Sequence, residues 1–501
     1  MTSPVDVLRR RAESRGEDPV LEGPAGTVSA AALLDRVEAL AEQLRVSEAA
    51  VIGLLSDNSV DWVVADMASQ CDALCLVPIP TFFSDAQLRH VLDSASIDTL
   101  LFDEQNQQRI SALLGGGNDA CAHGAPTLRW RRLAVAKAAS MPAGTEKLTF
   151  TSGSTGSPKG VCLSLAQCQR VAVSLASVLD EEAPRHLCAL PLSTLLENIG
   201  GLYMPLISAG TSLVYPLEQL GMAGSSGLRP RRFLKAVSQL QPSTMILVPQ
   251  FLSLFDSALS SGWQAPASLR FVAVGGGRVA PAVVQRVRAA GLPVYEGYGL
   301  SECASVVALN TRQHDRPGTS GKVLPHVTVV QQNSELVVCG NSFLGYLDEP
   351  RSWGVEQILT GDLGSVTEDG FVTVKGRSKN VLVSSFGRNI SPEWVESELL
   401  ASGLFAQVMV LGDDRPFCAA LLLPATNELD DASVQLAIDK VNATLPDYAR
   451  VARWLRLFEP FSVAAGSLTD NGRLRRDHIC KRYTDEVDQL YSITEQEPMA
   501  V

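Results

Sequence analysis

The chain has 501 residues, of which 46% are hydrophobic and 19% are charged, a balance typical of globular proteins and a length that predicts two to four domains. Its formal net charge of −12 argues against nucleic acid as the main partner, because nucleic-acid binding depends on Lys and Arg side chains that neutralise phosphates. No uninterrupted run of about 18 apolar residues is present, so no membrane span is predicted.

Residues 1–19 contain basic side chains with no apolar stretch behind them, which is unlike a secretory signal. The ten cysteines are scattered and form no CxxC pair, unlike the dense cysteines of a secreted disulfide scaffold. We therefore expect a reduced, cytoplasmic protein. The six histidines are dispersed as well, and we interpret them as surface or core residues rather than as metal ligands or members of a catalytic triad.

Strand-like and helix-like segments alternate through the first three-quarters of the chain. The first strands are predicted at Val51–Ser56, Ala73–Pro80 and Thr99–Asp103, with helices at Asp61–Asp72 and Asp85–Ala95. Such alternation is typical of an α/β fold in which helices cover parallel or mixed sheets. The polar, glycine-rich segment Gly115–Pro126 is predicted to be a loop.

The next segment, Lys147–Gly160, reads KLTFTSGSTGSPKG: a short apolar strand and then a loop of glycines and hydroxyl residues that ends in Lys159. Glycines let backbone N–H groups approach a polyphosphate closely, and hydroxyls and a lysine add further donors. The Walker A pattern is absent. We predict a phosphate-binding loop formed by Thr151, Ser152, Gly153, Ser154, Thr155, Gly156 and Lys159, with a plain solvated loop as the alternative.

Five further segments follow in order, namely FVAVGGG (Phe271–Gly277), YEGYGLSE (Tyr295–Glu302), TGDLG (Thr360–Gly364), GRSKNVLVSSFGRNISPEWVE (Gly376–Glu396) and LTDNGRLRR (Leu468–Arg476). Together with the phosphate loop, they resemble the motif blocks of the adenylate-forming (AMP-binding) superfamily, which includes acyl-CoA synthetases, adenylation enzymes and luciferases. The resemblance spans roughly residues 20 to 485.

This resemblance implies two domains: a large AMP-binding domain of parallel and mixed sheets covered by helices, residues 1–377, and a small, mobile α+β lid domain, residues 378–501. The hinge would be Lys379. Independently of the resemblance, the residue pattern changes after Gly376. Strands are predicted at Phe405–Leu411, Cys418–Leu423 and Trp454–Phe458, with a helix at Ala432–Leu445, a normal size for a separate module.

The implied chemistry is attack of an acid's carboxylate on the α-phosphate of ATP, with pyrophosphate as the leaving group. Such a reaction is accelerated mainly by positioning and by electrostatic neutralisation. By resemblance, the catalytic residues are Arg473, Lys159 and Glu302. Glu302 is also the expected Mg²⁺ ligand, because a hard cation prefers carboxylate oxygen. ATP, Mg²⁺ and coenzyme A, or a carrier-protein phosphopantetheine, are the implied cofactors.

The remaining nucleotide contacts are also assigned by resemblance. Tyr298 would flank adenine, Asp362 would accept from the ribose hydroxyls, and Arg377 would contact phosphate or ribose. For each there is an alternative: a core tyrosine, an aspartate bonded to its own turn, and an ion-paired linker arginine. The full set expected to bind the nucleotide adds Gly275, Gly276, Gly277, Glu296, Gly299 and Ser301.

The chain departs from the family pattern at Arg473, which stands where the family has its catalytic lysine. A guanidinium stays positive and can contact two anionic oxygens at once, but it is planar and bulkier than an ammonium group. The change puts the rate of the first half-reaction in question. We expect Arg473 to reach the site only when the small domain covers it.

The acid pocket is expected along Leu190–Gly210 and Leu247–Phe255, which look most similar to the long-chain acyl-CoA synthetase branch. Thr194 replaces that branch's histidine, and Glu197 is kept. No segment matches the aspartate that pairs an amino-acid substrate, so a fatty or other hydrophobic acid is favoured, although both segments could be ordinary core. Glu197, Asn198 and Gly387 are expected along the substrate or thiol channel.

These patterns predict an acid–thiol ligase that forms an acyl-adenylate and transfers the acyl group to coenzyme A. One alternative is a stand-alone ligase that loads an acyl carrier protein, because both acceptors present the same thiol. An alternative of another class is a nucleotide-binding pseudoenzyme, which is motivated only by Arg473.

Overall fold

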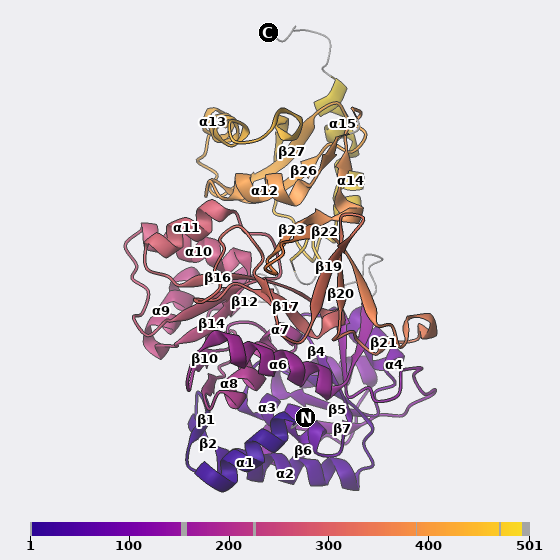
Figure 1. Cartoon of the computed structure of the whole chain (residues 1–501). Helices are drawn as coiled ribbons and strands as arrows, with labels where there is room; N and C mark the ends of the chain where they lie inside the picture. The colour runs from indigo at the N-terminus through magenta and orange to yellow at the C-terminus, as the bar shows by residue number, and fades with distance from the viewer. Residues whose placement is uncertain (1–2, 152–157, 224–226, 387, 470–471, 493–501) are drawn as a thin grey trace.

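The computed structural model describes residues 3–151, 158–223, 227–386, 388–469 and 472–492. The described part runs from the first helices at the bottom of Figure 1 to a small module at the top, with two large sheets between them. Ser152, Gly153, Ser154, Thr155, Gly156 and Gly387, all named in the predictions above, lie outside the described residues.

The first large sheet has eight strands in the order β21-β9-β8-β4-β3-β5-β7-β6. Its central strands β3, β4, β5 and β8 run parallel to one another, whereas β6, β7, β9 and β21 pair antiparallel with their neighbours. The strands are β3 (Val51–Leu55), β4 (Cys75–Ile79), β5 (Thr99–Asp103), β6 (Ala120–Ala122), β7 (Ala125–Arg132), β8 (Lys147–Thr151), β9 (Lys159–Leu163) and β21 (Gly345–Tyr346).

The second large sheet has nine strands in the order β18-β17-β16-β15-β14-β10-β11-β1-β2. Strands β1, β10, β11, β14, β15 and the start of β16 are parallel, and the two ends of the sheet are antiparallel. The strands are β1 (Pro19–Gly23), β2 (Gly26–Ser29), β10 (Arg185–Leu187), β11 (Thr211–Leu213), β14 (Thr244–Leu247), β15 (Phe271–Val274), β16 (Val294–Leu300), β17 (Ser305–Leu309) and β18 (Lys322–Val323).

Helices cover both faces of these sheets, because alternate strand residues are apolar on both sides. In β3, Ile52 and Leu54 pack in the core shared with α3 and α6, whereas Leu55 packs with α4 and α5 on the opposite face. The helices of this region are α1 (Pro4–Arg15), α2 (Ala30–Val46), α3 (Val60–Cys71), α4 (Asp85–Ser94), α5 (Gln107–Leu114), α6 (Leu165–Leu179), α7 (Leu195–Glu197), α8 (Met204–Ile207), α9 (Pro230–Leu240), α10 (Pro249–Ser260) and α11 (Pro281–Ala289).

Two smaller sheets complete the fold, one at the top of Figure 1 and the other below it, beside β16 and β17. The lower one is antiparallel, in the order β19-β20-β22-β23, formed by β19 (Thr328–Gln332), β20 (Glu335–Cys339), β22 (Gln357–Val366) and β23 (Val372–Arg377). The other is β26-β27-β28, formed by β26 (Phe405–Leu411), β27 (Cys418–Pro424) and β28 (Val451–Arg456). Its helices are α12 (Pro392–Leu400), α13 (Asp431–Asn442), α14 (Arg476–Arg482) and α15 (Thr484–Ser492).

Short elements connect these layers. The two-residue strands β12 (Met222–Ala223) and β13 (Gly227–Leu228) pair with each other, as do β24 (Leu382–Val383) and β25 (Asn389–Ile390). Single helical turns occur at η1 (Glu104–Asn106), η3 (Ser301–Cys303), η4 (Pro350–Ser352), η5 (Ser378–Asn380) and η6 (Asp447–Ala449), and a π-helical segment, η2, spans Asn198–Tyr203.

The α/β class, with a large N-terminal part and a smaller C-terminal part, is confirmed. The loop predicted at Gly115–Pro126 is wrong in part, because it contains β6 and the start of β7. Gly124, at φ +69°, allows the tight turn between them, and pairing with β5 outweighs the polar composition. The third strand of the small module, β28, begins three residues before the predicted Trp454.

The described helices include none that is long and apolar enough to cross a membrane. All ten cysteines lie in the described part, and each is a free thiol. The split at residue 377 and the hinge at Lys379 stay predictions.

Candidate active site

A cavity of about 1570 Å³ lies where the two large sheets, the antiparallel sheet and the small module meet. Most of the described residues that the sequence singled out line it, although they are spread over more than 300 positions of the chain. They are Thr151, Lys159, Gly275, Gly276, Gly277, Glu296, Tyr298, Gly299, Ser301, Glu302, Asp362, Arg377, Lys379 and Arg473. The cavity lies beyond the carboxyl ends of β14 and β15, the usual place for a ligand in an open α/β sheet.

Thr151 and Lys159 face each other across the β8–β9 pair, at the mouth of the predicted phosphate loop. The Lys159 ammonium lies 2.7 Å from Glu349 Oε1 and 4.8 Å from the centre of the Tyr346 ring. Both charged side chains are half-exposed, at 46% and 47%. Lys159 is therefore held at the cavity by a weak surface ion pair that a phosphate could replace.

Glu302 lies in η3, which directly follows strand β16. Its Oε1 accepts a hydrogen bond of 2.8 Å from the Tyr346 hydroxyl, and burial, together with the Glu302 charge, raises the pKa of that tyrosine. The Glu302 charge also acts on Asp362 and Arg473 across the cavity. One carboxylate at the edge of a phosphate site fits Mg²⁺, which takes few protein ligands and keeps phosphate and water oxygens.

Asp362 joins Tyr298 and Arg377 in one polar group. Its Oδ2 accepts a 2.7 Å hydrogen bond from the Tyr298 hydroxyl, and its Oδ1 lies 2.7 Å from Arg377 Nε. Burial raises the pKa of Asp362, and the Arg377 charge opposes that shift. Asp362 is part of strand β22, where it pairs in register with Arg377. The interpretation that placed Asp362 in a turn is therefore wrong. Arg377 is ion-paired, but its partner is inside the cavity.

Glu296 and the three glycines form the wall beside β15. Glu296 pairs in register with Val274, the last residue of β15, and its Oε2 accepts from the backbone N–H of Gly318 at 3.3 Å. Burial raises the pKa of Glu296 to about 7. Gly276 has a φ of +80°, a conformation that favours glycine.

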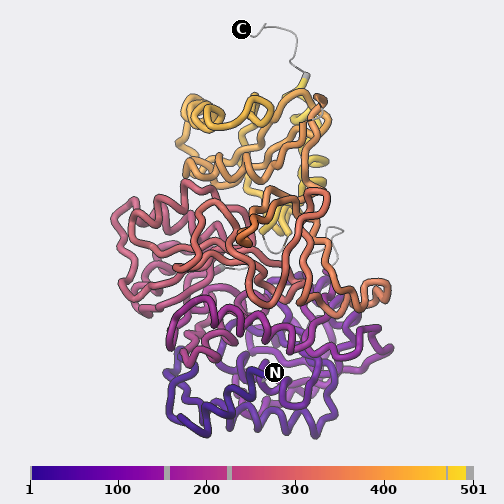
Figure 2. The backbone as a smooth tube through the Cα atoms, viewed as in Figure 1, coloured from indigo at the N-terminus to yellow at the C-terminus, as the bar shows by residue number. Residues whose placement is uncertain are grey.

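Arg473 reaches the cavity from the small module. Its Nη2 lies 3.4 Å from the carbonyl oxygen of Gly276. Burial lowers the pKa of Arg473, and the nearby Arg377 adds to this effect, whereas Asp362 and Glu302 favour the charged form. In Figure 2 the yellow C-terminal segment correspondingly descends from the small module towards the larger one. The small module therefore covers the cavity in this structure.

An apolar branch of the cavity extends between α6 and the second large sheet. Its walls are formed by Leu175, Leu179, Leu195, Leu196, Met204, Ile246, Phe271, Val306 and Leu309, with the polar side chains His186 and Thr244 among them. Of the two segments predicted to form the acid pocket, Leu190–Gly210 contributes Thr194, Leu195, Leu196, Gly200 and Met204 to the cavity, whereas none of the described residues of Leu247–Phe255 lines it.

Glu197 and Asn198 are not among the described residues that line the cavity, so the prediction that they lie along the channel is wrong. The helical segment that carries them turns Leu196, Gly200 and Met204 to the cavity and buries the opposite side. Glu197 accepts from the Leu190 backbone N–H at 3.1 Å and bonds to His186 Nε2 at 3.0 Å. Asn198 contacts the buried Lys147.

His186, Cys188 and Glu197 are buried together, with one potential metal-ligand atom of each within 4.8 Å of the others. This group could not be predicted from residue spacing, because its members come from β10, the residue following it and α7. His186 Nδ1 bonds to Thr244 Oγ1 at 3.0 Å, so both ring nitrogens have partners. Hydrogen bonding accounts for this arrangement without an ion.

Comparisons with known proteins agree on the family and the fold. A family profile described as "AMP-binding enzyme" matches residues 8–347, and one described as "AMP-binding enzyme C-terminal domain" matches residues 379–495. The long-chain-fatty-acid–CoA ligase FadD15 of Mycobacterium bovis is 30% identical over 240 residues, which cover 41% of this chain and 39% of that relative. The match thus spans about two fifths of the relative's length.

Solved structures match nearly the whole chain at low identity. The anthranilate CoA ligase AuaEII in complex with anthranoyl-AMP has a TM-score of 0.82 at 18% identity, covering 97% of this chain and 98% of that one. The o-succinylbenzoate CoA synthetase MenE of Bacillus subtilis, in complex with its acyl-adenylate intermediate, has a TM-score of 0.76 at 22% identity, covering 94% and 97%.

Proposed function

This chain belongs to the AMP-binding enzyme family, and we propose that it activates a hydrophobic carboxylic acid with ATP and transfers the acyl group to coenzyme A. The observation that carries this proposal is the lining of one cavity, which combines charged side chains with the apolar side chains that form what we call its apolar branch. The charged side chains include Lys159, Arg473 and Glu302, whose charges suit a triphosphate and its cation. The apolar branch suits an acid that lacks charged groups other than its carboxylate.

In the first step, a carboxylate oxygen of the acid attacks the α-phosphorus of ATP. The bond between the α-phosphorus and the bridging oxygen breaks, and pyrophosphate leaves. Lys159 would neutralise the leaving phosphates, and Arg473 would hold the acid's carboxylate against the α-phosphate through its forked guanidinium. Glu302 would hold Mg²⁺, which neutralises part of the triphosphate charge when bound. Positioning and charge neutralisation are the main contributions in this type of transfer.

In the second step, the thiol sulfur attacks the acyl carbonyl carbon, AMP leaves, and the thiol proton passes to solvent. We propose that residues 378–501 rotate about Lys379 between the two steps, because Arg473 occupies the cavity in the arrangement described above. Gly387 would then approach the thiol arm.

The apolar branch supports the proposed substrate class. Its walls are leucine, isoleucine, methionine, valine and phenylalanine side chains, and the polar side chains His186 and Thr244 are bonded to each other. An α-ammonium group placed there would lose its hydration without a carboxylate to pair with, at a high cost. A fatty or aromatic acid fits. Several relatives are fatty-acid–CoA ligases by name, which supports coenzyme A as the acceptor, whereas one relative is named as an acyl-carrier-protein ligase.

The test is ATP–pyrophosphate exchange measured with a panel of acids that includes fatty, aromatic and amino acids, followed by an assay for the acyl-CoA thioester. We expect exchange with a hydrophobic acid and thioester formation with free coenzyme A. Exchange with an amino acid only would contradict the substrate class, and thioester formation only on a carrier protein would contradict the acceptor. No exchange with any acid, together with ATP binding, would favour a nucleotide-binding pseudoenzyme.

A further inference from the structure

A fully buried ammonium group lies behind the cavity. The Lys147 side chain is 1% exposed and its Nζ lies 2.6 Å from Asp66 Oδ1, whose side chain is 0% exposed. Nζ also contacts the Tyr203 hydroxyl at 2.8 Å and Asn198 Oδ1. An ammonium group has three N–H donors, so these acceptors use all of them. Tyr203 in turn donates to Asp66 Oδ2 at 2.8 Å.

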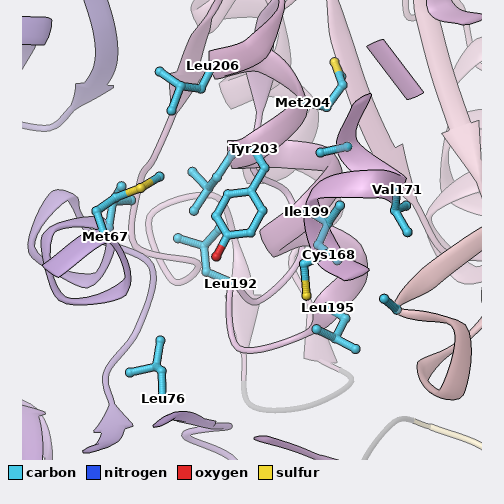
Figure 3. Close-up of a cluster of buried hydrophobic side chains, with 14 of the residues drawn as sticks. Met67, Leu76, Cys168, Val171, Leu192, Leu195, Ile199, Tyr203, Met204 and Leu206 are labelled. Carbon is cyan, nitrogen blue, oxygen red and sulfur yellow. The ribbon is translucent and has the colours of Figure 1, made fainter. Parts of the chain in front are cut away.

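Stability alone is a poor explanation for this group. Removing two charges from water is costly, and replacing a buried ion pair with apolar side chains is often neutral or stabilising. The surroundings are apolar: Tyr203 packs among Met67, Ile199 and Met204 in the largest core (Figure 3). In addition, Asn198 Nδ2 is buried without a hydrogen-bond partner among the described residues, which is itself destabilising.

The buried polar group around Lys147 connects two parts of the proposed site, the strand before the phosphate loop and the wall of the acid pocket. Lys147 is the first residue of β8, and β8 ends at Thr151 on the cavity wall. Asn198 and Tyr203 are the first and last residues of the π-helical segment η2. Gly200, which is in η2, and Met204, which directly follows η2, both line the cavity. Single-turn π segments in α-helices occur often at functional sites. The Lys147 ammonium group thus binds both ends of the acid-pocket wall to the strand that leads into the phosphate loop.

We propose that Lys147 is a positioning residue that fixes the η2 wall of the acid pocket relative to strand β8. Only the expected change in the KM for the acid rests on the proposed function. Strand β8 pairs with β9 over five residues and with β4 on its other side, so the strand is held without the ammonium group. The η2 segment has a helical backbone, and the side chains at both of its ends contact Lys147, although Tyr203 also bonds to Asp66. Loss of the network should therefore displace the acid pocket and leave the ATP site in place.

The experiment compares three variants. Lys147→Met removes the ammonium group, and Tyr203→Phe removes one hydroxyl with little loss of volume, so it tests the network even if the first variant does not fold. Arg131→Met is the matched control. Arg131 and Asp119 form another buried ion pair, with side chains 6% and 10% exposed, at the β6–β7 edge of the same sheet.

In acid-dependent ATP–pyrophosphate exchange, we expect the KM for the acid to rise about tenfold or more in Lys147→Met and less in Tyr203→Phe, with the KM for ATP within about twofold of wild type. The relative kcat/KM of a short and a long acid should also change. In the Arg131→Met control, neither the KM values for acid and ATP nor the relative kcat/KM of the short and long acids should change. Equal increases in both KM values, or an unchanged acid KM in both network variants, would overturn the proposal.

Amide hydrogen exchange of the folded proteins gives a second readout that needs no activity. We expect faster exchange in residues 198–207 of the network variants, with exchange in residues 147–151 unchanged. The same pattern in the Arg131→Met control, or loss of protection spread evenly over the chain, would overturn the proposal. If the wild-type protein shows no acid-dependent ATP–pyrophosphate exchange, the proposed function fails. The pattern of amide hydrogen exchange still decides whether Lys147 positions η2.

Discussion

The Arg473 guanidinium lies 3.4 Å from the Gly276 carbonyl oxygen, 197 positions away in the chain. This contact brings a side chain of the small module into the cavity of the large one. It also places the guanidinium near the carboxylates of Asp362 and Glu302, which favour its charged form. We expect Arg473 to stand at the family's lysine position, and the contact places its side chain in the cavity that we propose as the reaction centre.

The first prediction therefore concerns Arg473. We expect Arg473→Ala to slow adenylation by about 10²–10³-fold, because a charge that stabilises the reacting phosphate is lost. Thiolation of a pre-formed acyl-adenylate should change little, because we propose that the small module is rotated in that step. Arg473→Lys should keep or raise the adenylation rate. Single-turnover assays of both steps measure these effects, and equal losses in the two steps would contradict a role confined to adenylation.

The second prediction concerns Glu302. Glu302→Gln removes the carboxylate charge that we propose for Mg²⁺, and activity should fall by about 100-fold or more. The dependence of the rate on Mg²⁺ concentration should shift to higher concentrations.

Tyr346→Phe is the control for this change, because it removes the 2.8 Å hydrogen bond to Glu302 and leaves the charge. It should affect the rate far less. If the rate of Glu302→Gln depended on Mg²⁺ concentration as the wild-type rate does, the assignment of Glu302 as a metal ligand would be wrong.

The third prediction concerns the Lys159–Glu349 ion pair. Lys159→Ala should raise the KM for ATP about tenfold or more, because a phosphate contact is lost. Glu349→Gln should lower that KM slightly, because Lys159 no longer has to leave a partner. Neither variant should change the stability much, since both side chains are about half exposed. ATP titrations and thermal unfolding test this, and a large rise in the KM of Glu349→Gln would show that Glu349 itself supports nucleotide binding.

The fourth prediction concerns Glu296, whose pKa is raised to about 7 by burial. Because the folded state favours the protonated form, the stability that this group contributes is present below the ordinary glutamate pKa of about 4.3 and is lost as the pH rises to 7. Glu296→Gln lacks this titration. At pH 8 the variant should be more stable than wild type by up to about 3 kcal/mol, and the difference should vanish near pH 4.

Urea unfolding of the ligand-free protein at several pH values measures this difference. Glu104→Gln, at an exposed position, is the control and should give no difference of this size. If the stabilisation by Glu296→Gln were the same at pH 5 and pH 8, titration of Glu296 would not be its cause.

Much of the fold could be predicted from the sequence, because strands and helices follow from local apolar patterns. The predicted strands Thr99–Asp103 and Phe405–Leu411 have the same bounds in the structure. Most of the described site residues could also be predicted, because motif blocks keep their order along the chain. The strands β6 and β7 were partly missed, since β7 pairs with the distant strand β5 and β6 pairs with β7, so both depend on contacts outside their own segments.

The tertiary structure alone decided which side chains face the cavity. Glu197 belongs to a motif block, yet it points to His186, because α7 and η2 turn Leu196 and Gly200 to the cavity instead. Tyr346 and Glu349 carried no sequence signal, although they contact Glu302 and Lys159. The physical reason is that a motif records residue types and spacing, whereas the direction of a side chain depends on local helical geometry and on partners far away in the chain.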